Sequence, residues 1–338
     1  MLQTKRMPAI DVLAQLKEYF AGHSLHKLHT VQSLWSGYGD VSRYVSPRLN
    51  TTFIVKHISP PTNPVHPKGW NTQSSHQRKL HSYQVEANFY RDYAPLCDEY
   101  CLVPELLAAF SENQQQIIVL QYLDQGGFSL RKDQASMADV ALGIKWLAYF
   151  HARFLQQDHC DLWPVGTYWH LATRQDEFEV MQAGQLKDAA QALDTALNHA
   201  HFQTLVHGDA KLANFCFPDN HGANRLAAVD FQYVGQGIGV KDLAYFLGAC
   251  LNQDDLFKHE QCLLDAYFLH LKDALYHYQI DVDFMPLQQE WRTLYPVAWA
   301  DFYRFLLGWS PGHYKINPYM HRQTDMALAM LVNLKGSR

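Results

Sequence analysis

Residues 203–234 constrain the fold more than any other part of the chain. This segment interrupts a long helical region, and its apolar runs predict short strands at 205–206, 215–217 and 226–229. A turn is expected at 218–222, where Pro, Asp, Asn and Gly follow one another. One small sheet embedded in a helical domain is therefore predicted. The surrounding helices are expected at 174–199, 255–278, 284–309 and 320–334.

The same segment carries a set of polar residues suited to phosphoryl transfer. His207, Asp209 and Asn214 have the spacing H-x-D-x-x-x-x-N, and Asp230 follows an apolar strand. Phosphoryl transfer needs one carboxylate to orient the attacking hydroxyl, while a second carboxylate and an amide oxygen hold the magnesium ions. Asp and Asn are also ordinary turn residues. The agreement of two separate parts of the pattern favours the functional interpretation.

Composition excludes several classes of protein. The chain has 338 residues, and 48% of them are hydrophobic, which suffices for the core of one large or two medium domains. A net charge of −5 gives no reason to expect nucleic acid or an anionic membrane as a partner. No apolar stretch is long enough for a membrane helix, and no signal-peptide core is visible. We expect a cytoplasmic protein, and the sequence leaves its oligomeric state open.

The N-terminal part of the sequence is predicted to contain more strands and fewer helices than the rest of the chain. An amphipathic helix is predicted at 8–21, strands between 30 and 58, and an exposed loop at 59–75. A helix at about 75–93 and a strand pair at 103–110 and 115–123 follow. The expected domains are a strand-rich part at 1–120, a connection at 121–127 and a helical part at 128–338.

Four motifs resemble one superfamily of kinases. HGDAKLAN (207–214) and VDFQ (229–232) are similar to the catalytic and metal-binding segments of the aminoglycoside phosphotransferase and choline kinase superfamily. EANFY (86–90), together with the Gln of VDFQ, resembles its ecdysteroid-kinase-like branch, and LAYFHA (147–152) is similar to a helix common in these enzymes. The resemblance implies an α+β, bilobal protein-kinase-like fold. Its small antiparallel-sheet N-lobe and larger, mainly helical C-lobe would bind ATP between them.

The resemblance implies roles for the polar residues of the C-lobe. Asp209 would be the catalytic base, and Asn214 and Asp230 would hold Mg²⁺. Lys211 occupies a place where protein Ser/Thr kinases carry a lysine that neutralises the transferred phosphoryl group. The sequence does not decide whether Lys211 assists transfer or faces solvent.

Three further polar residues are expected to be structural. His207 is interpreted as a loop residue, and Asp242, in the family's D-L-A segment, as a hydrogen-bond acceptor for the catalytic-loop backbone. His151 is expected to be a packed helix residue, because nothing near it in sequence would tune it for catalysis.

The N-lobe would bind the nucleotide. Gly37 and Gly39 form a G-x-G-x-x-S pattern that either approaches the phosphates or simply makes a hairpin turn. Lys56 would contact the phosphates and be held by Glu86; otherwise they are an edge-strand lysine and a surface carboxylate. The backbone of the hinge would bind adenine at Gln121, Tyr122 and Leu123.

The acceptor is the least constrained part of the prediction. The aromatic residues between 291 and 319 suit a choline-like cation or a flat apolar alcohol. Asp301 is the one carboxylate among them. Because an aminoglycoside carries several ammonium groups, this scarcity of carboxylates argues against an aminoglycoside as the acceptor.

From these motifs we expect an ATP- and Mg²⁺-dependent kinase acting on a small-molecule hydroxyl. A nucleotide-binding pseudokinase is the alternative, and the lack of an A-P-E segment after Asp230 disfavours a protein kinase.

Overall fold

The computed structural model describes residues 10–61, 72–220 and 224–336. The chain divides into an N-terminal unit, residues 1–95 and 104–127, and a C-terminal unit, residues 96–103 and 128–338. The first contains an antiparallel sheet and the second is mainly helical. The predicted α+β class is confirmed.

The sheet of the N-terminal unit has five antiparallel strands in the order β1-β2-β3-β5-β4. Strand β3 lies in the middle, so Lys56 faces Val41 on one side and Ile118 on the other. This central position excludes the edge-strand interpretation of Lys56. The strands are β1 (His26–Ser33), β2 (Gly39–Ser46), β3 (Thr51–Ile58), β4 (Leu106–Glu112) and β5 (Gln115–Gln121).

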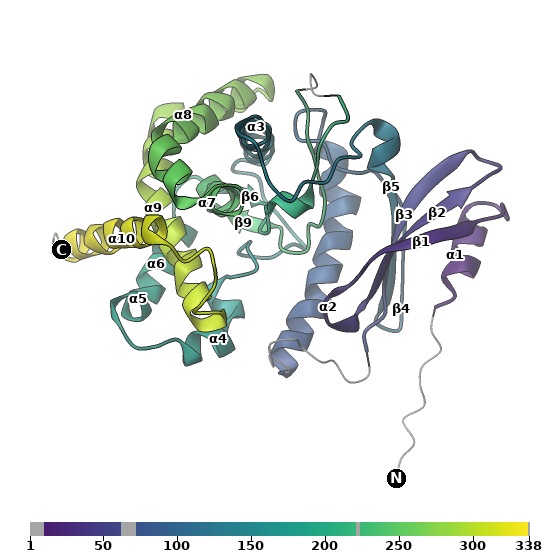
Figure 1. Cartoon of the computed structure of the whole chain (residues 1–338), viewed down its shortest axis with the longest axis horizontal. Helices are drawn as coiled ribbons and strands as arrows, with labels where there is room; N and C mark the ends of the chain where they lie inside the picture. Colours follow the sequence, from purple (N-terminus) through teal and green to yellow (C-terminus); the bar gives the residue numbers. More distant parts are fainter. Residues whose placement is uncertain (1–9, 62–71, 221–223, 337–338) are drawn as a thin grey trace, which may run out of the picture. The chain divides into compact units, whose positions relative to one another are not determined.

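Two helices cover opposite faces of this sheet (Figure 1). Alternation along β3 directs Phe53 and Val55 to the face where Leu16 of α1 (Val12–Tyr19) completes an apolar core. Lys56 points to the other face, toward α2 (Gln73–Asn88). The predicted helix at 8–21 is confirmed over α1, and residues 62–71 of the predicted loop lie outside the described residues. Shorter helical turns are Trp35–Gly37, Phe89–Tyr93, Ala94–Leu96 and Leu123–Gly126.

Long helices build the C-terminal unit. Helix α3 packs against α8, and α9 contacts α4, α6, α7 and α10. Ser136 caps α3 through a capping box with Asp139. No helix in the described ranges is both long and apolar enough to cross a membrane. The main helices are α3 (Met137–Arg153), α7 (Gly239–Cys250), α8 (Gln253–His277), α9 (Phe284–Trp309) and α10 (Pro318–Gly336).

Two local predictions are wrong. The single helix expected at 174–199 is broken after Val180, because Met181 and Gly184 have extended backbone. The one expected embedded sheet is two separate pairs, since β6 pairs with β9 while β7 pairs with β8. Of the predicted turn at 218–222, residues 221 and 222 lie outside the described residues. The elements are α4 (Gln175–Val180), α5 (Gln185–Asp188), α6 (Ala190–Asn198), β6 (Thr204–Val206), β7 (Phe215–Cys216), β8 (Ala227–Ala228), β9 (Gly235–Gly237) and the turns Leu171–Thr173 and Leu212–Asn214.

Residues 96–103 belong to the C-terminal unit, although the sequence assigned them to the N-terminal part. Leu102 forms a parallel bridge with Ala227, and its carbonyl accepts a hydrogen bond from the Trp146 indole at 3.1 Å. Arg153 donates to the carbonyl of Leu96 at 2.6 Å. These bonds tie the segment to α3 and β8.

Candidate active site

The loop after β6 is fixed by a glycine and a buried carboxylate. Gly208 has a φ of +78°, and a Cβ there would lie 2.1 Å from the carbonyl oxygen of Tyr233. Only glycine fits this position without displacing the backbone. Asp242 accepts hydrogen bonds from the N–H groups of His207 at 2.5 Å and Gly208 at 3.0 Å. This is the backbone contact that the sequence predicts for Asp242.

The carboxylate of Asp242 is in turn held by α3. His151 Nε2 lies 3.2 Å from Asp242 Oδ2, and His151 Nδ1 lies 2.8 Å from the hydroxyl of Tyr267. The His151 side chain is fully buried. His151 is therefore a packed residue that supports the loop through Asp242, as expected.

His207 also stabilises the loop. Its Nδ1 accepts a hydrogen bond from the Asp209 N–H at 3.3 Å, and its Nε2 lies 3.1 Å from the carbonyl oxygen of Val229. The ring packs on Phe231 with centroids 4.5 Å apart. Its ring joins the loop of Asp209 to the strand that precedes Asp230.

Three side chains donate hydrogen bonds to Asp209. Lys211 Nζ and Asn214 Nδ2 lie 2.7 and 3.2 Å from Oδ2, and the Tyr245 hydroxyl lies 3.0 Å from Oδ1. Asn214 also donates to the Asp209 carbonyl at 2.8 Å. Together these bonds fix the orientation of the Asp209 carboxylate. The carboxylates of Asp209 and, more weakly, Asp230 raise the pKa of Lys211, so Lys211 is cationic at neutral pH.

The short β7–β8 pair brings Asn214 and Asp230 together. Phe215 pairs with Ala228, and the Val229 N–H donates to the Asn214 carbonyl at 2.9 Å. Asp230 follows directly and has a φ of +70°, in the left-handed region that Asp and Asn tolerate better than most residues. Asp209, Asn214 and Asp230 thus converge within the C-terminal unit.

The donor set of this cluster suits a hard divalent cation. Asn214 Nδ2 is engaged by Asp209, and within the described ranges no group donates to its Oδ1. Asp230 contributes a carboxylate, of which Oδ1 accepts from Gln232 at 2.6 Å. Mg²⁺ prefers oxygen ligands and is bound through one or two carboxylates together with substrate phosphates. The described residues contain no group of three or more His, Cys, Asp or Glu with metal-binding geometry.

In the N-terminal unit, Lys56 and Glu86 form a buried ion pair. Lys56 Nζ lies 2.6 Å from Glu86 Oε2, and the two side chains are 7% and 2% exposed. The Tyr83 ring lies 5.6 Å from the same ammonium. This is the pairing that the sequence predicts, and Glu86 is not a surface charge.

Gly37 and Gly39 of the predicted phosphate loop have different surroundings at the position where a Cβ would lie. A Cβ on Gly39 would lie 1.9 Å from the His57 carbonyl oxygen, so the close approach of β2 and β3 demands glycine there. Gly37 has a φ of +75° and open space around its Cβ position. The hairpin geometry therefore explains Gly39, while Gly37 leaves room for a ligand near the backbone.

Of the residues predicted to bind adenine, Gln121 is the last residue of β5, and Tyr122 and Leu123 follow it. The Gln121 N–H is engaged by the Glu105 carbonyl at 2.9 Å. Leu123 begins a short helical turn, where the first N–H groups have no partner within the helix. The centroid of the Tyr122 ring lies 4.5 Å from the Arg43 guanidinium, and the Tyr122 hydroxyl donates to Asp124 Oδ2 at 2.6 Å.

Sequence reasoning missed two residues beside Asp209. Tyr245 lies one helical turn after Asp242 in α7, a spacing that could have placed it on the same face. Lys315 lies in the α9–α10 loop, and its Nζ is 4.3 Å from the centroid of the Tyr245 ring. No local sequence pattern marks Lys315, because tertiary packing alone brings it to this position.

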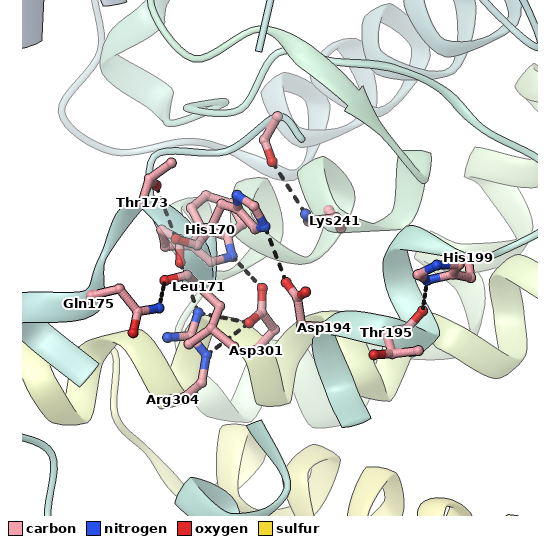
Figure 2. Close-up of polar contacts among 12 residues, drawn as sticks. His170, Leu171, Thr173, Gln175, Asp194, Thr195, His199, Lys241, Asp301 and Arg304 are labelled. Atoms are coloured by element: carbon pink, nitrogen blue, oxygen red, sulfur yellow. Dashed lines mark hydrogen bonds and ion pairs between the residues drawn. The ribbon is translucent and has the colours of Figure 1, made fainter. Parts of the chain in front are cut away.

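Asp301 is part of an internal network. Its carboxylate accepts from Arg304 at 2.8 and 3.0 Å and from the Trp169 indole at 3.1 Å, and its side chain is 3% exposed. Figure 2 shows this pair beside the His170–Asp194 contact of 3.3 Å. Asp301 is thus satisfied by its neighbours and cannot serve as the binding group for an acceptor ammonium.

One family model and several solved structures are similar to this chain. The model of the ecdysteroid kinase-like family matches residues 166–280, which include the loop of Asp209 and Asn214 and also Asp230, so the predicted resemblance is confirmed over this segment. No curated protein matches the sequence.

Among solved structures, an amicoumacin kinase in complex with AMP-PNP and Ca²⁺ is 13% identical to this chain. The match covers 96% of this chain and 93% of that chain, with a TM-score of 0.49. A microcompartment-associated aminopropanol kinase is 12% identical (96% and 98% covered, TM-score 0.48). The choline kinase of Streptococcus pneumoniae is 13% identical (95% and 98% covered, TM-score 0.41).

Proposed function

We propose that this chain, whose residues 166–280 match the ecdysteroid kinase-like family, transfers the γ-phosphoryl group of Mg·ATP to the hydroxyl of a small molecule. The observation that carries the proposal is that the β7–β8 pair brings Asn214 close to the segment of Asp230, while Asn214 is hydrogen-bonded to Asp209. Such a kinase works where ATP is present, and we place it in the cytoplasm.

Asp209 would orient the acceptor hydroxyl and take up its proton. The Tyr245 and Lys211 bonds orient the carboxylate, and an incoming hydroxyl would donate to it in the same way. Lys211 is salt-bridged to Asp209 but its side chain is 41% exposed, so it can turn toward a transferred phosphoryl group. Its positive charge would then offset negative charge on that group.

Asn214 and Asp230 would hold the divalent cation. When bound, Mg²⁺ bridges the phosphates and offsets the charge that develops during transfer. The Asn214 amide is oriented by its two bonds to Asp209, which fixes its oxygen relative to the base. The base and the metal ligands are therefore positioned by one hydrogen-bonded unit.

The N-terminal unit would supply the nucleotide contacts. Lys56, fixed by Glu86, would contact the α- and β-phosphates, and the backbone at Gly37 and Gly39 would approach the phosphates. Adenine would bind to backbone groups at Gln121, Tyr122 and Leu123. Side chains contribute little to such contacts, so the choice between ATP and GTP has to be measured.

The proposal is tested by separating nucleotide binding from turnover. Calorimetric titration with ATP or GTP, each with and without Mg²⁺, measures binding, and ADP or GDP release across a library of small alcohols measures transfer. Asp209→Ala should leave nucleotide affinity nearly unchanged and abolish turnover, because the base does not hold the nucleotide. Asp273→Ala, which removes an exposed carboxylate of α8, is the control. Full turnover by Asp209→Ala would refute the mechanism, and nucleotide binding without turnover on any acceptor would identify a pseudokinase.

A further inference from the structure

Lys315 is a buried cation without a polar partner. The residue is 7% exposed, and across the ranges the structure describes its ammonium makes no hydrogen bond or ion pair. The loop around it is ordered by the bonds of His313 to Ser310 and of Ile316 to His313, both 2.9 Å. Buried charges in proteins are usually paired. An unpaired one that the loop holds in place is therefore a candidate binding group.

The ammonium of Lys315 lies beside the proposed base. Its Nζ is 4.3 Å from the Tyr245 ring centroid and 5.7 Å from that of Phe302, and the Tyr245 hydroxyl donates to Asp209 Oδ1. Burial lowers the pKa of Lys315 to about 8, against the opposing attraction of Asp209. Lys211, not Lys315, is within ion-pair distance of Asp209. The three donors of the Lys315 ammonium thus remain available next to the base.

This arrangement selects the charge of the acceptor. Aromatic faces attract cations, but the faces of Tyr245 and Phe302 already lie against Lys315. A choline-like acceptor would meet a like charge there instead of an open aromatic face. An anionic oxygen would instead form a charge-assisted hydrogen bond with a group that has no other partner.

We infer that Lys315 is a specificity residue, and that the acceptor carries an anionic group in addition to the hydroxyl that is phosphorylated. This inference rests on the proposed function for the position of the hydroxyl at Asp209. The anion itself could be a carboxylate or a phosphate.

The test uses acceptor probes of nearly equal size and different charge. These are p-hydroxymethylbenzoate and p-hydroxymethylphenyl phosphate as anions, p-hydroxymethylbenzamide as the neutral compound, and p-hydroxymethylbenzyltrimethylammonium as the cation. Calorimetry should show that the wild type binds at least one anion about tenfold or more tightly than the neutral and cationic probes. The tighter anion distinguishes carboxylate from phosphate. Equal binding of all probes, binding of none, or preference for the cation would overturn the inference.

Variants assign the preference to Lys315. Lys315→Met should lose the preference for anions, whereas Lys315→Arg, which keeps the charge, should retain most of it. Lys258→Met removes an exposed lysine of α8 and should change nothing. An anion preference that survives in Lys315→Met would also overturn the inference. ADP release and Mg·ATP binding are measured in parallel, so a failure of the kinase proposal is recorded separately from a failure of anion selection.

Discussion

Asp242 and His151 form a contact in which neither side chain has any exposed surface, with 3.2 Å between Asp242 Oδ2 and His151 Nε2. They belong to α7 and α3, and the same carboxylate accepts the N–H groups of His207 and Gly208. One buried side chain thus sets the backbone immediately before the proposed base. Asp242 is a positioning residue, because it contacts the loop and not a reacting atom.

Asp242→Asn should lower turnover more than nucleotide affinity. In the wild type the N–H groups of His207 and Gly208 donate to different oxygens of the Asp242 carboxylate. The Asn side chain has only one acceptor oxygen, so at least one of these two bonds is lost. We expect kcat to fall about tenfold with little change in the KM for ATP, and unfolding free energy to fall by about 1–3 kcal/mol. Steady-state kinetics and urea denaturation measure these effects. Asp273→Asn, on the exposed face of α8, is the matched control, and a kcat equal to wild type would contradict the positioning role.

The Lys56–Glu86 pair should show strong coupling in a double-mutant cycle. Either Lys56→Met or Glu86→Gln leaves a buried, uncompensated group, which costs about 3–5 kcal/mol of stability. The double variant should be less destabilised than the sum of the two single variants, while ATP affinity should fall whenever Lys56 is replaced. Urea denaturation and calorimetry measure both quantities.

The same sheet provides a control for that cycle. Lys27 and Asp40 form an exposed pair at 3.4 Å, with side chains 40% and 32% exposed. Lys27→Met should change stability by less than about 1 kcal/mol, because solvent screens such pairs. If the losses of unfolding free energy in the two single variants simply add up in the double variant, Lys56 and Glu86 do not stabilise each other and the prediction is contradicted.

Asp230→Asn should remove the metal dependence of nucleotide binding without unfolding the protein. Asn tolerates the φ of +70° at this position, and its oxygen can still accept from Gln232. The loss of one negative charge should weaken the Mg²⁺-dependent part of ATP affinity about tenfold or more. Calorimetric titrations with and without Mg²⁺ measure it. If Mg²⁺ strengthens ATP binding equally in both proteins, Asp230 is not a metal ligand.

The sequence predicts most of the candidate site because Asp209, Asn214 and Asp230 lie close together in the chain. The spacing of Asp209 and Asn214 and the apolar strand before Asp230 contain the needed information, and the strand pair β7–β8 is local. The break after Val180 could not be predicted, since the segment has helical composition and only Gly184 interrupts it. Lys315 could not be predicted either, because only the packing of α7, α9 and their loops brings it to Tyr245.

Lys315→Met should make the protein more stable at neutral pH. The folded-state pKa of Lys315 is about 8, below its ordinary value of 10.5, because burial disfavours the charged form. Asp209 and Cys250 oppose this shift and Lys211 adds to it. Below pH 8 the folded state therefore carries the full cost of the buried charge, which is at most about 3 kcal/mol for a shift of this size.

The pH dependence distinguishes this cost from a simple change in packing. Between the two pKa values the unfolded chain binds more protons than the folded one, so this group makes wild-type stability rise with pH. The gain from Lys315→Met should be largest below about pH 8 and should shrink as the pH rises toward the unfolded value. Urea denaturation of wild type, Lys315→Met and Lys258→Met from about pH 6 to about pH 10 tests the prediction. A stability difference that does not change with pH would mean that packing alone explains the effect of Lys315→Met, and it would contradict the prediction.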